Sequence, residues 1–150
     1  YYKNPYLLMG NAYVYLEQYD QAIESYNTAL KLDSEFADAI NNRGIAYREA
    51  GKMYGEKRGD IVKALQYLNQ AHAALPNDYE TNRLLGVANG IQGRNEQAIA
   101  FFKKCIQLEP ENAGAYVNLG NAYYNAGQTE EGAAMHQKAL SIDPNALRPQ

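Results

Sequence analysis

Few side chains in this sequence have the type and spacing that catalysis or metal binding requires. The two histidines, His72 and His136, lie 64 residues apart, and neither has a cysteine or carboxylate at metal-ligand spacing. The single cysteine, Cys105, excludes an internal disulfide framework, and we expect it to be a small buried residue. Gly51-Lys52 lacks the earlier glycine and the following Ser or Thr of a phosphate-binding loop, and no nucleophile elbow occurs. We therefore expect a chain that is not an enzyme and that takes no metal or cofactor.

Composition and charge narrow the class of partner. The length of 150 residues is that of one domain, and 46% hydrophobic with 21% charged residues is typical of a folded globular chain. The formal net charge of −3 argues against nucleic acid, which requires a basic excess. No apolar run approaches the roughly 18 residues that membrane insertion needs. The chain opens at Tyr1 without an initiator Met, which suggests a fragment, and the compartment stays open between cytoplasm and periplasm.

Internal repetition supplies the elements that position the remaining side chains. Glycines recur at intervals of 34, 42 and 34 residues, at Gly10, Gly44, Gly86 and Gly120. Small residues recur at intervals of 42, 34 and 34, at Ala22, Ala64, Ala98 and Gly132. Prolines recur at intervals of 34, at Pro76, Pro110 and Pro144. Three independent markers therefore give one period of 34 residues, interrupted by a single insertion of eight residues.

Each unit is predicted to contain two helices, called here helix A and helix B. Asn4 is a plausible N-cap, and Pro5 suits the first position of a helix. Pro disfavours a helical residue before it, so Glu109-Pro110 and Asp143-Pro144 indicate the ends of B helices. Large residues stand four positions after three of the small ones, at Tyr26, Leu68 and Phe102, and are expected to fill the space between neighbouring units.

The pattern resembles the tetratricopeptide repeat (TPR) family, and the resemblance covers about residues 3 to 146. The last unit carries the family's landmark residues at Tyr116, Leu119, Gly120, Tyr123, Gly132, His136, Ala139 and Pro144, of which His136 departs from the expected aromatic. The resemblance implies an all-α fold: a right-handed superhelical α-solenoid of four helix-turn-helix units forming a single domain over residues 1–150. The predicted units are 3–36, 37–78, 79–112 and 113–146, and helices A are expected to line a concave groove.

The resemblance also places the candidate binding residues on the groove face of helices A. These are Asn11, Tyr15, Asn42, Arg48, Arg83, Asn118, Asn121 and Tyr124. An amide side chain offers both a donor and an acceptor, so an asparagine can pair with a peptide backbone of any sequence. We therefore expect a protein or peptide partner, held in a groove that alternates between apolar and amide-rich units.

Two specific functions of the family can be compared with these positions. The clamp for chaperone C-termini is rejected, because Leu7, Glu80 and Leu84 stand where its cationic residues belong. The asparagine ladder of some glycosyltransferase superhelices is closer in character, although only Asn42 and Asn118 match its repeating place.

The insertion lies between Gly44 and Ala64, in the second unit. We favour a protruding extension of helix A over a loop, with Tyr47, Ala50 and Tyr54 on one stripe. The basic residues Lys52, Lys57 and Arg58 are a possible contact for an acidic partner, and a solvated helix end is the plainer interpretation.

Three functions remain open at the level of sequence. The first is a scaffold that binds a protein or peptide in the groove. The second is self-association, including a homodimer, through an uncapped C-terminal end where the last B helix exposes Ala134 and Leu140. The third is a regulatory TPR segment of a larger enzyme or secretion component.

Overall fold

Short helices build the whole of the described chain. The computed structural model describes residues 4–149, and within this range every regular element is helical, which confirms the all-α prediction. The chain divides into two compact units at Pro76 and Asn77. The first unit contains α1 (Pro5–Tyr15), α2 (Tyr19–Leu32), α3 (Ala37–Lys52), the π-helical η1 (Met53–Lys57) and α4 (Ile61–Ala74). The second contains α5 (Tyr79–Ile91), α6 (Asn95–Leu108), α7 (Ala113–Asn125) and α8 (Thr129–Ile142).

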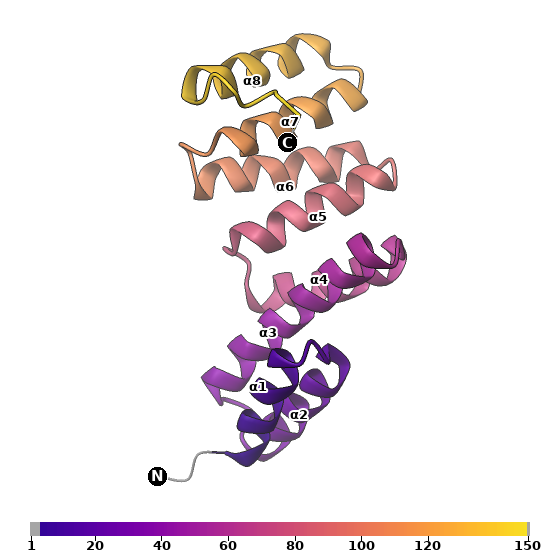
Figure 1. Cartoon of the computed structure of the whole chain (residues 1–150), viewed down its shortest axis with the longest axis vertical. Helices are drawn as coiled ribbons and strands as arrows, with labels where there is room; N and C mark the ends of the chain where they lie inside the picture. Colours follow the sequence, from indigo (N-terminus) through magenta and orange to yellow (C-terminus); the bar gives the residue numbers. More distant parts are fainter. Residues whose placement is uncertain (1–3, 150) are drawn as a thin grey trace. The chain divides into compact units, whose positions relative to one another are not determined.

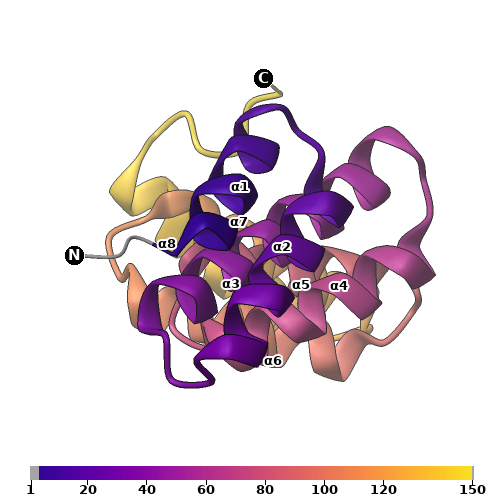
Figure 2. The same ribbon diagram turned by 90° about the horizontal axis from the view of Figure 1, so that it is seen from below.

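Each of these two compact units contains two helix pairs, and each helix pair corresponds to one of the four repeats predicted from the sequence. Figure 1 shows consecutive helices of a unit lying side by side, and Figure 2 shows α1 beside α2 from another direction. Whether the two units form a single domain, as the sequence suggests, stays a prediction.

The predicted start and stop signals are confirmed in the backbone. Asn4 caps α1, since its Oδ1 accepts the backbone N–H of Tyr6 at 3.0 Å, and Pro5 is the first helical residue. Helix α6 ends immediately before Glu109-Pro110, and α8 ends immediately before Asp143-Pro144. Local chain chemistry therefore sets these boundaries without help from distant contacts.

The turn inside each helix pair requires a left-handed backbone. Gly59, Gly93 and Gly127 occupy this position with φ angles of 65°, 71° and 77°. In the first pair Glu17 takes it with φ 57°, a conformation that L side chains adopt at a cost. The shared conformation shows that all four helix pairs close with the same kind of turn.

Aromatic side chains join helix B of one repeat to helix A of the next. Tyr26 is 1% exposed and packs with Ala46 and Ala50 of α3, while Phe102 packs with Leu119 and Ala122 of α7. These contacts confirm, within each unit, the expectation that large residues fill the space between neighbouring repeats.

The glycines of the repeat show where the insertion is accommodated. A Cβ on Gly10, Gly86 or Gly120 would strike the ring found 16 positions later. In the second repeat the corresponding close approach is made by Gly51, whose Cβ would lie 2.6 Å from Cγ of Leu68, 17 positions later. Gly44 instead faces Ala74 and Leu75 at the end of α4. In the second repeat the close approach of the two helices is therefore made at Gly51 and not at the marker Gly44.

This register explains how eight extra residues fit into the repeat. Gly51 lies seven positions after Gly44, close to two turns of α-helix, so these added positions lengthen α3 while keeping the same face toward α4. The eighth residue is absorbed by η1, because a π-helical turn holds one residue more than an α-helical turn. The preference for helix over loop is thus confirmed through Lys57.

The end of the extension is packed rather than free-standing. Tyr54 is 5% exposed, and its ring stacks on Tyr67 of α4 with centroids 5.2 Å apart. Both hydroxyls donate to the carboxylate of Asp20 on α2. Burial and the Asp20 carboxylate raise the pKa of Tyr67, so this hydroxyl stays protonated. The description of the extension as a protrusion was wrong for Tyr54, although Glu56, Lys57 and Arg58 are exposed.

Candidate functional site

The first repeat pair holds a pocket of about 250 Å³ whose polar groups are joined by hydrogen bonds. It is lined by Asn11, Val14, Tyr26, Asn42 and Ile45. Oδ1 of Asn11 accepts from the Tyr26 hydroxyl at 2.7 Å and from Nδ2 of Asn42 at 2.9 Å. Because its Oδ1 accepts both hydrogen bonds, the side-chain amide of Asn11 is held in one orientation. The Nδ2 donor of Asn11 and the Oδ1 acceptor of Asn42 remain available to a ligand.

The Tyr26 side chain positions Asn11 from a protected place. Its ring lies against Gly10, where any side chain would displace it. Burial raises the pKa of Tyr26 to about 12, so the hydroxyl remains a donor at every physiological pH.

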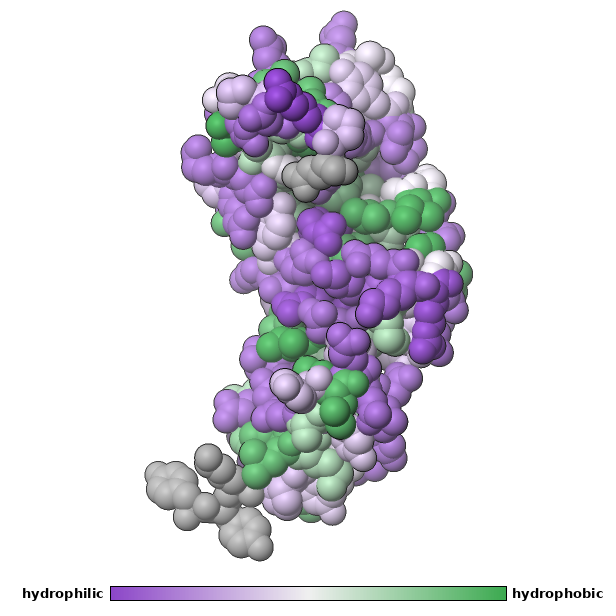
Figure 3. Space-filling view, in the orientation of Figure 1, coloured by the Kyte–Doolittle hydropathy of each residue, from purple (hydrophilic) through white to green (hydrophobic). Residues whose placement is uncertain are grey.

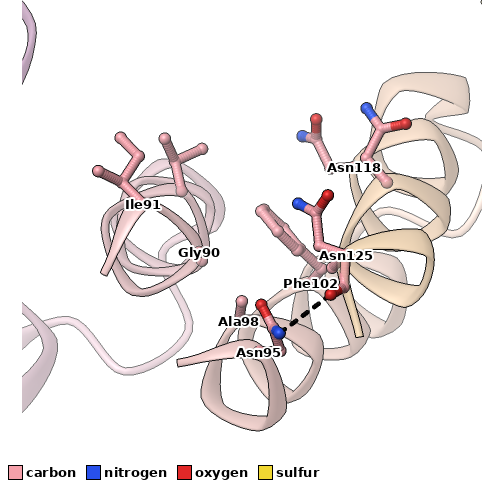
Figure 4. Close-up of a pocket in the computed structure, with 11 residues that line it drawn as sticks. Gly90, Ile91, Asn95, Ala98, Phe102, Asn118 and Asn125 are labelled. Atoms are coloured by element: carbon pink, nitrogen blue, oxygen red, sulfur yellow. Dashed lines mark hydrogen bonds between the residues drawn. The ribbon is translucent and has the colours of Figure 1, made fainter. Parts of the chain in front are cut away.

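The second repeat pair holds a pocket of about 300 Å³ between α5, α6 and α7. Figure 4 shows Ile91 on one side, Asn118 and Asn125 on the other, and the Phe102 ring between them. The complete lining is Gly86, Val87, Gly90, Ile91, Asn95, Ala98, Phe102, Asn118, Asn121, Ala122 and Asn125. None of these residues carries a charge.

The two pockets are equivalent sites that lie two repeats apart in the sequence. Each residue of the first pocket has a counterpart in the second that lies 76 positions later. Thus Asn42 corresponds to Asn118, Tyr26 to Phe102 and Asn11 to Val87. The repeat therefore places an asparagine on one wall and an aromatic ring on the floor in both units.

Amide groups form the polar rim of the second pocket. Nδ2 of Asn95 donates to the backbone carbonyl of Asn125 at 3.2 Å, which ties the start of α6 to the end of α7 (Figure 4). No hydrogen bond within residues 4–149 engages the side-chain amide of Asn118. Its donor and acceptor are therefore available to a bound peptide group.

The His136 ring contacts Asn121, a partnership that the sequence did not predict. Its ring lies against Gly120, and its Nε2 lies 2.9 Å from Oδ1 of Asn121. This is the geometry of Tyr26 with Gly10 and Asn11, so the departure from the family's aromatic keeps a polar ring beside the asparagine. The pair Gly-Asn with a polar ring 16 positions later was the signal that could have revealed it.

The remaining groove candidates lie outside both pockets. Tyr15 is 88% exposed. Arg48 is paired with Glu49 at 2.9 Å, and Arg83 makes two hydrogen bonds to Glu80 at 2.8 Å. Tyr124 stands beside the His136 ring with centroids 5.1 Å apart. Both arginines therefore form ion pairs with neighbouring glutamates of the same helix. A role in binding for these four residues stays a prediction.

The basic residues near the insertion are surrounded by carboxylates. Lys52 and Lys57 line a pocket of about 220 Å³ together with Glu17, Glu49 and Glu56. Lys57 lies 3.7 Å from Glu17, and the Arg58 guanidinium sits 4.8 Å from the centroid of the Tyr54 ring. The positive charge is largely matched, so the prediction of an acidic partner here gains no support from the geometry.

Among residues 4–149, no group of three or more His, Cys, Asp or Glu side chains is placed to hold a metal ion. None of the helices described is both long and apolar enough to cross a bilayer. On the face in Figure 3 the apolar side chains form separate patches among hydrophilic ones.

Family models identify the repeats independently of the spacing. The model described as "TPR repeat" matches residues 10–51, and the one described as "Tetratricopeptide repeat" matches residues 91–149. The chain belongs to the tetratricopeptide repeat family. One model falls in each unit, and the fold of helix pairs agrees with both.

Curated relatives share the repeats over most of this chain. The TPR repeat-containing protein MJ1428 of Methanocaldococcus jannaschii is 29% identical over 91% of the chain and 23% of its own length. The probable UDP-N-acetylglucosamine–peptide N-acetylglucosaminyltransferase SPINDLY of Hordeum vulgare is 30% identical over 83% of the chain and 13% of its own length. The chain thus spans about a quarter or less of these relatives, and the TPR segment is what they have in common.

A solved structure confirms the solenoid fold. YrrB, described as a TPR protein with an unusual peptide-binding site, superposes with a TM-score of 0.60 at 25% identity, covering 94% of this chain and 86% of its own. The described helix pairs therefore have the TPR solenoid fold.

Proposed function

We propose that this chain is a non-catalytic scaffold that binds an extended peptide segment of a partner protein on the groove face of helices A. The observation that carries the proposal is the recurrence of one arrangement, an asparagine wall over an aromatic floor, at Asn42 with Tyr26 and at Asn118 with Phe102. A repeated site suits a repeated ligand, and the peptide backbone is the ligand that repeats along any protein chain.

The chemistry of the walls fits peptide groups. Every residue of an extended peptide presents a carbonyl acceptor and, proline apart, an N–H donor, and an asparagine amide can pair with both. In Asn42 the Oδ1 acceptor is available for such a contact, and in Asn118 both the donor and the acceptor of the amide are available. The peptide-binding site named for YrrB supports the same use of a TPR surface in a similar fold.

The geometry adds to the case against a clamp for free carboxylates. Leu84 is 5% exposed and belongs to the core, and Glu80 holds Arg83 in a two-point ion pair. A terminal carboxylate would meet no available cation at these positions.

The test uses a display library of random short peptides selected on the intact chain. Peptides that enrich are then titrated by calorimetry against Asn42→Ala, Asn118→Ala and the double variant. Losing an amide contact costs about 1 kcal/mol, so we expect at least one single variant to bind several-fold more weakly than the wild-type chain.

The matched control is the Asn69→Ala, Asn77→Ala double variant, because both of these asparagines are exposed, neither lines a pocket and neither lies on a helix A. It should bind like the wild type, and all variants should melt within a few degrees of it. Unchanged affinity in the Asn42, Asn118 double variant would sink the proposal.

Self-association is the second candidate. Leu140 on α8 and Leu147 beyond it are 39% and 40% exposed, and such side chains could pack against a second copy. Sedimentation over a range of concentrations tests it, since a concentration-independent monomer rules it out. A regulatory TPR segment within a larger enzyme or secretion component stays a third possibility, which the sequence of the intact gene decides.

A further inference from the structure

The two equivalent pockets differ in the polarity of their floors. In the first, the Tyr26 hydroxyl, Oδ1 of Asn11 and Nδ2 of Asn42 form a hydrogen-bonded chain from α2 to α1 to α3. In the second, Val87 stands in place of Asn11 and Phe102 in place of Tyr26, so the chain of hydrogen bonds has no counterpart.

The floor of the second pocket presents apolar side chains in place of this hydrogen-bonded chain. Val87 and Ile91 on α5 are 37% and 62% exposed, and both line the pocket next to the Phe102 ring. Bringing an apolar side chain onto this surface removes both from water, which is favourable. The amides of Asn118 and Asn125 stand on the opposite wall, where the peptide groups flanking such a side chain would lie (Figure 4).

The lining also excludes charge. All eleven residues are neutral, so a Lys or Asp side chain entering the pocket would lose hydration without gaining a counterion. The first pocket differs at its floor, where Asn11 and the Tyr26 hydroxyl are hydrogen-bonded, although Val14 and Ile45 also line it.

We propose that the α5–α7 pocket is a specificity subsite that takes one uncharged apolar side chain, such as Leu, Ile or Met, from an extended peptide. The inference rests on the proposed peptide-binding function and adds the chemistry of the anchor. Val87 and Phe102 are the residues that set the preference, and Asn118 holds the backbone whatever the anchor is.

The probes are N-acetyl-leucine methylamide, which carries one apolar side chain between two peptide groups, and the corresponding lysine and aspartate compounds. They are titrated into the intact ¹⁵N-labelled chain while the signals of Gly90 and the Asn118 side-chain amide are followed. A ligand of this size is expected to bind with a dissociation constant on the order of 1 mM. We expect the leucine probe to bind at least tenfold more tightly than the lysine or aspartate probe.

Reciprocal variants make the assignment to these residues specific. Val87→Asn with Phe102→Tyr copies the first floor into the second pocket and should weaken the leucine probe about tenfold. Val87→Asn alone changes only a partly exposed residue and should give part of this loss even if the double variant folds poorly. Asn11→Val with Tyr26→Phe copies the second floor into the first pocket and should strengthen binding of the leucine probe at Asn42.

Each outcome separates the inference from the function on which it rests. Equal binding of the leucine, lysine and aspartate probes, or unchanged binding in Val87→Asn, overturns the apolar subsite while leaving peptide binding through Asn118 intact. Failure of the library selection together with the absence of any probe shift overturns the proposed function itself.

Discussion

Tyr26 has two roles in the first repeat. Its ring fills the space against Gly10 and the alanines of α3, and its hydroxyl fixes the orientation of Asn11 in the pocket. His136 does the same for Asn121 with a different ring. In this chain, therefore, packing and the presentation of groove amides depend on the same side chains.

Replacing Tyr26 by Phe keeps the ring and removes the hydrogen bond to Asn11. We expect the free energy of unfolding at pH 7 to fall by about 1 kcal/mol, measured by urea denaturation followed by circular dichroism. The pKa of Tyr26 is raised to about 12 from an ordinary 10, so the unfolded chain loses this proton first. The stabilising contribution is complete below pH 10 and is lost as the pH rises toward 12, so the deficit of the variant should narrow over that range.

The matched control is Tyr116→Phe, which removes a hydroxyl that donates to the Pro110 carbonyl at 2.9 Å and lies outside the pockets. It should cost a similar amount at pH 7 without changing peptide affinity. If the loss of unfolding free energy in Tyr26→Phe stays constant up to pH 12, burial does not raise the pKa of Tyr26 as described.

At the scale of the element, the second repeat shows how a helix pair absorbs an insertion. Two added turns keep the apolar face of α3 in phase, and the single residue left over is held in η1. The close approach of helix A to helix B then falls at Gly51, which packs on Leu68. The extension is fastened by Tyr54, Tyr67 and Asp20.

Two glycines four residues apart in this extension should respond oppositely to alanine. A Cβ at position 51 would lie 2.6 Å from Leu68 Cγ and 3.2 Å from the backbone oxygen of Ala64, so Gly51→Ala should destabilise the chain by about 2 kcal/mol. A Cβ at position 55 would meet Ala64 at 3.5 Å, an ordinary contact. Gly55→Ala should therefore be neutral or stabilising by up to about 1 kcal/mol through helix propensity.

Urea denaturation of the two variants side by side measures the difference. If Gly51→Ala proves as stable as Gly55→Ala, the register assigned to the insertion is incorrect.

At the scale of the whole molecule, the chain consists of two compact units, each with one copy of the pocket. Repeat arrays draw most of their stability from contacts between neighbouring repeats. A destabilising substitution in one compact unit is therefore expected to lower the stability of that unit more than that of the other.

Leu119→Ala tests this expectation, because Leu119 is 3% exposed and packs with Phe102 and Ala98. The variant should lose about 2–4 kcal/mol, and hydrogen exchange followed by mass spectrometry should show faster exchange in α6, α7 and α8 than in α1 and α2. The reciprocal change, Ile23→Ala in the first unit, is the control and should reverse the pattern. An equal rise in all eight helices would show instead that the chain unfolds as one cooperative domain.

The sequence by itself determined the class of fold, the repeats and the helix boundaries, since Asn4, the Glu109-Pro110 pair and the recurring small residues act on their immediate neighbours. The repeat period also brings Asn42 and Asn118 to equivalent places in the two pockets, and their role in binding stays a prediction. Only the tertiary structure decided that Gly51 rather than Gly44 makes the close approach to Leu68, and that Glu80 pairs with Arg83. It also showed that His136 contacts Gly120 and Asn121 in the way that Tyr26 contacts Gly10 and Asn11. These facts depend on the register of one helix against another, and that register is fixed by side chains far apart in the chain.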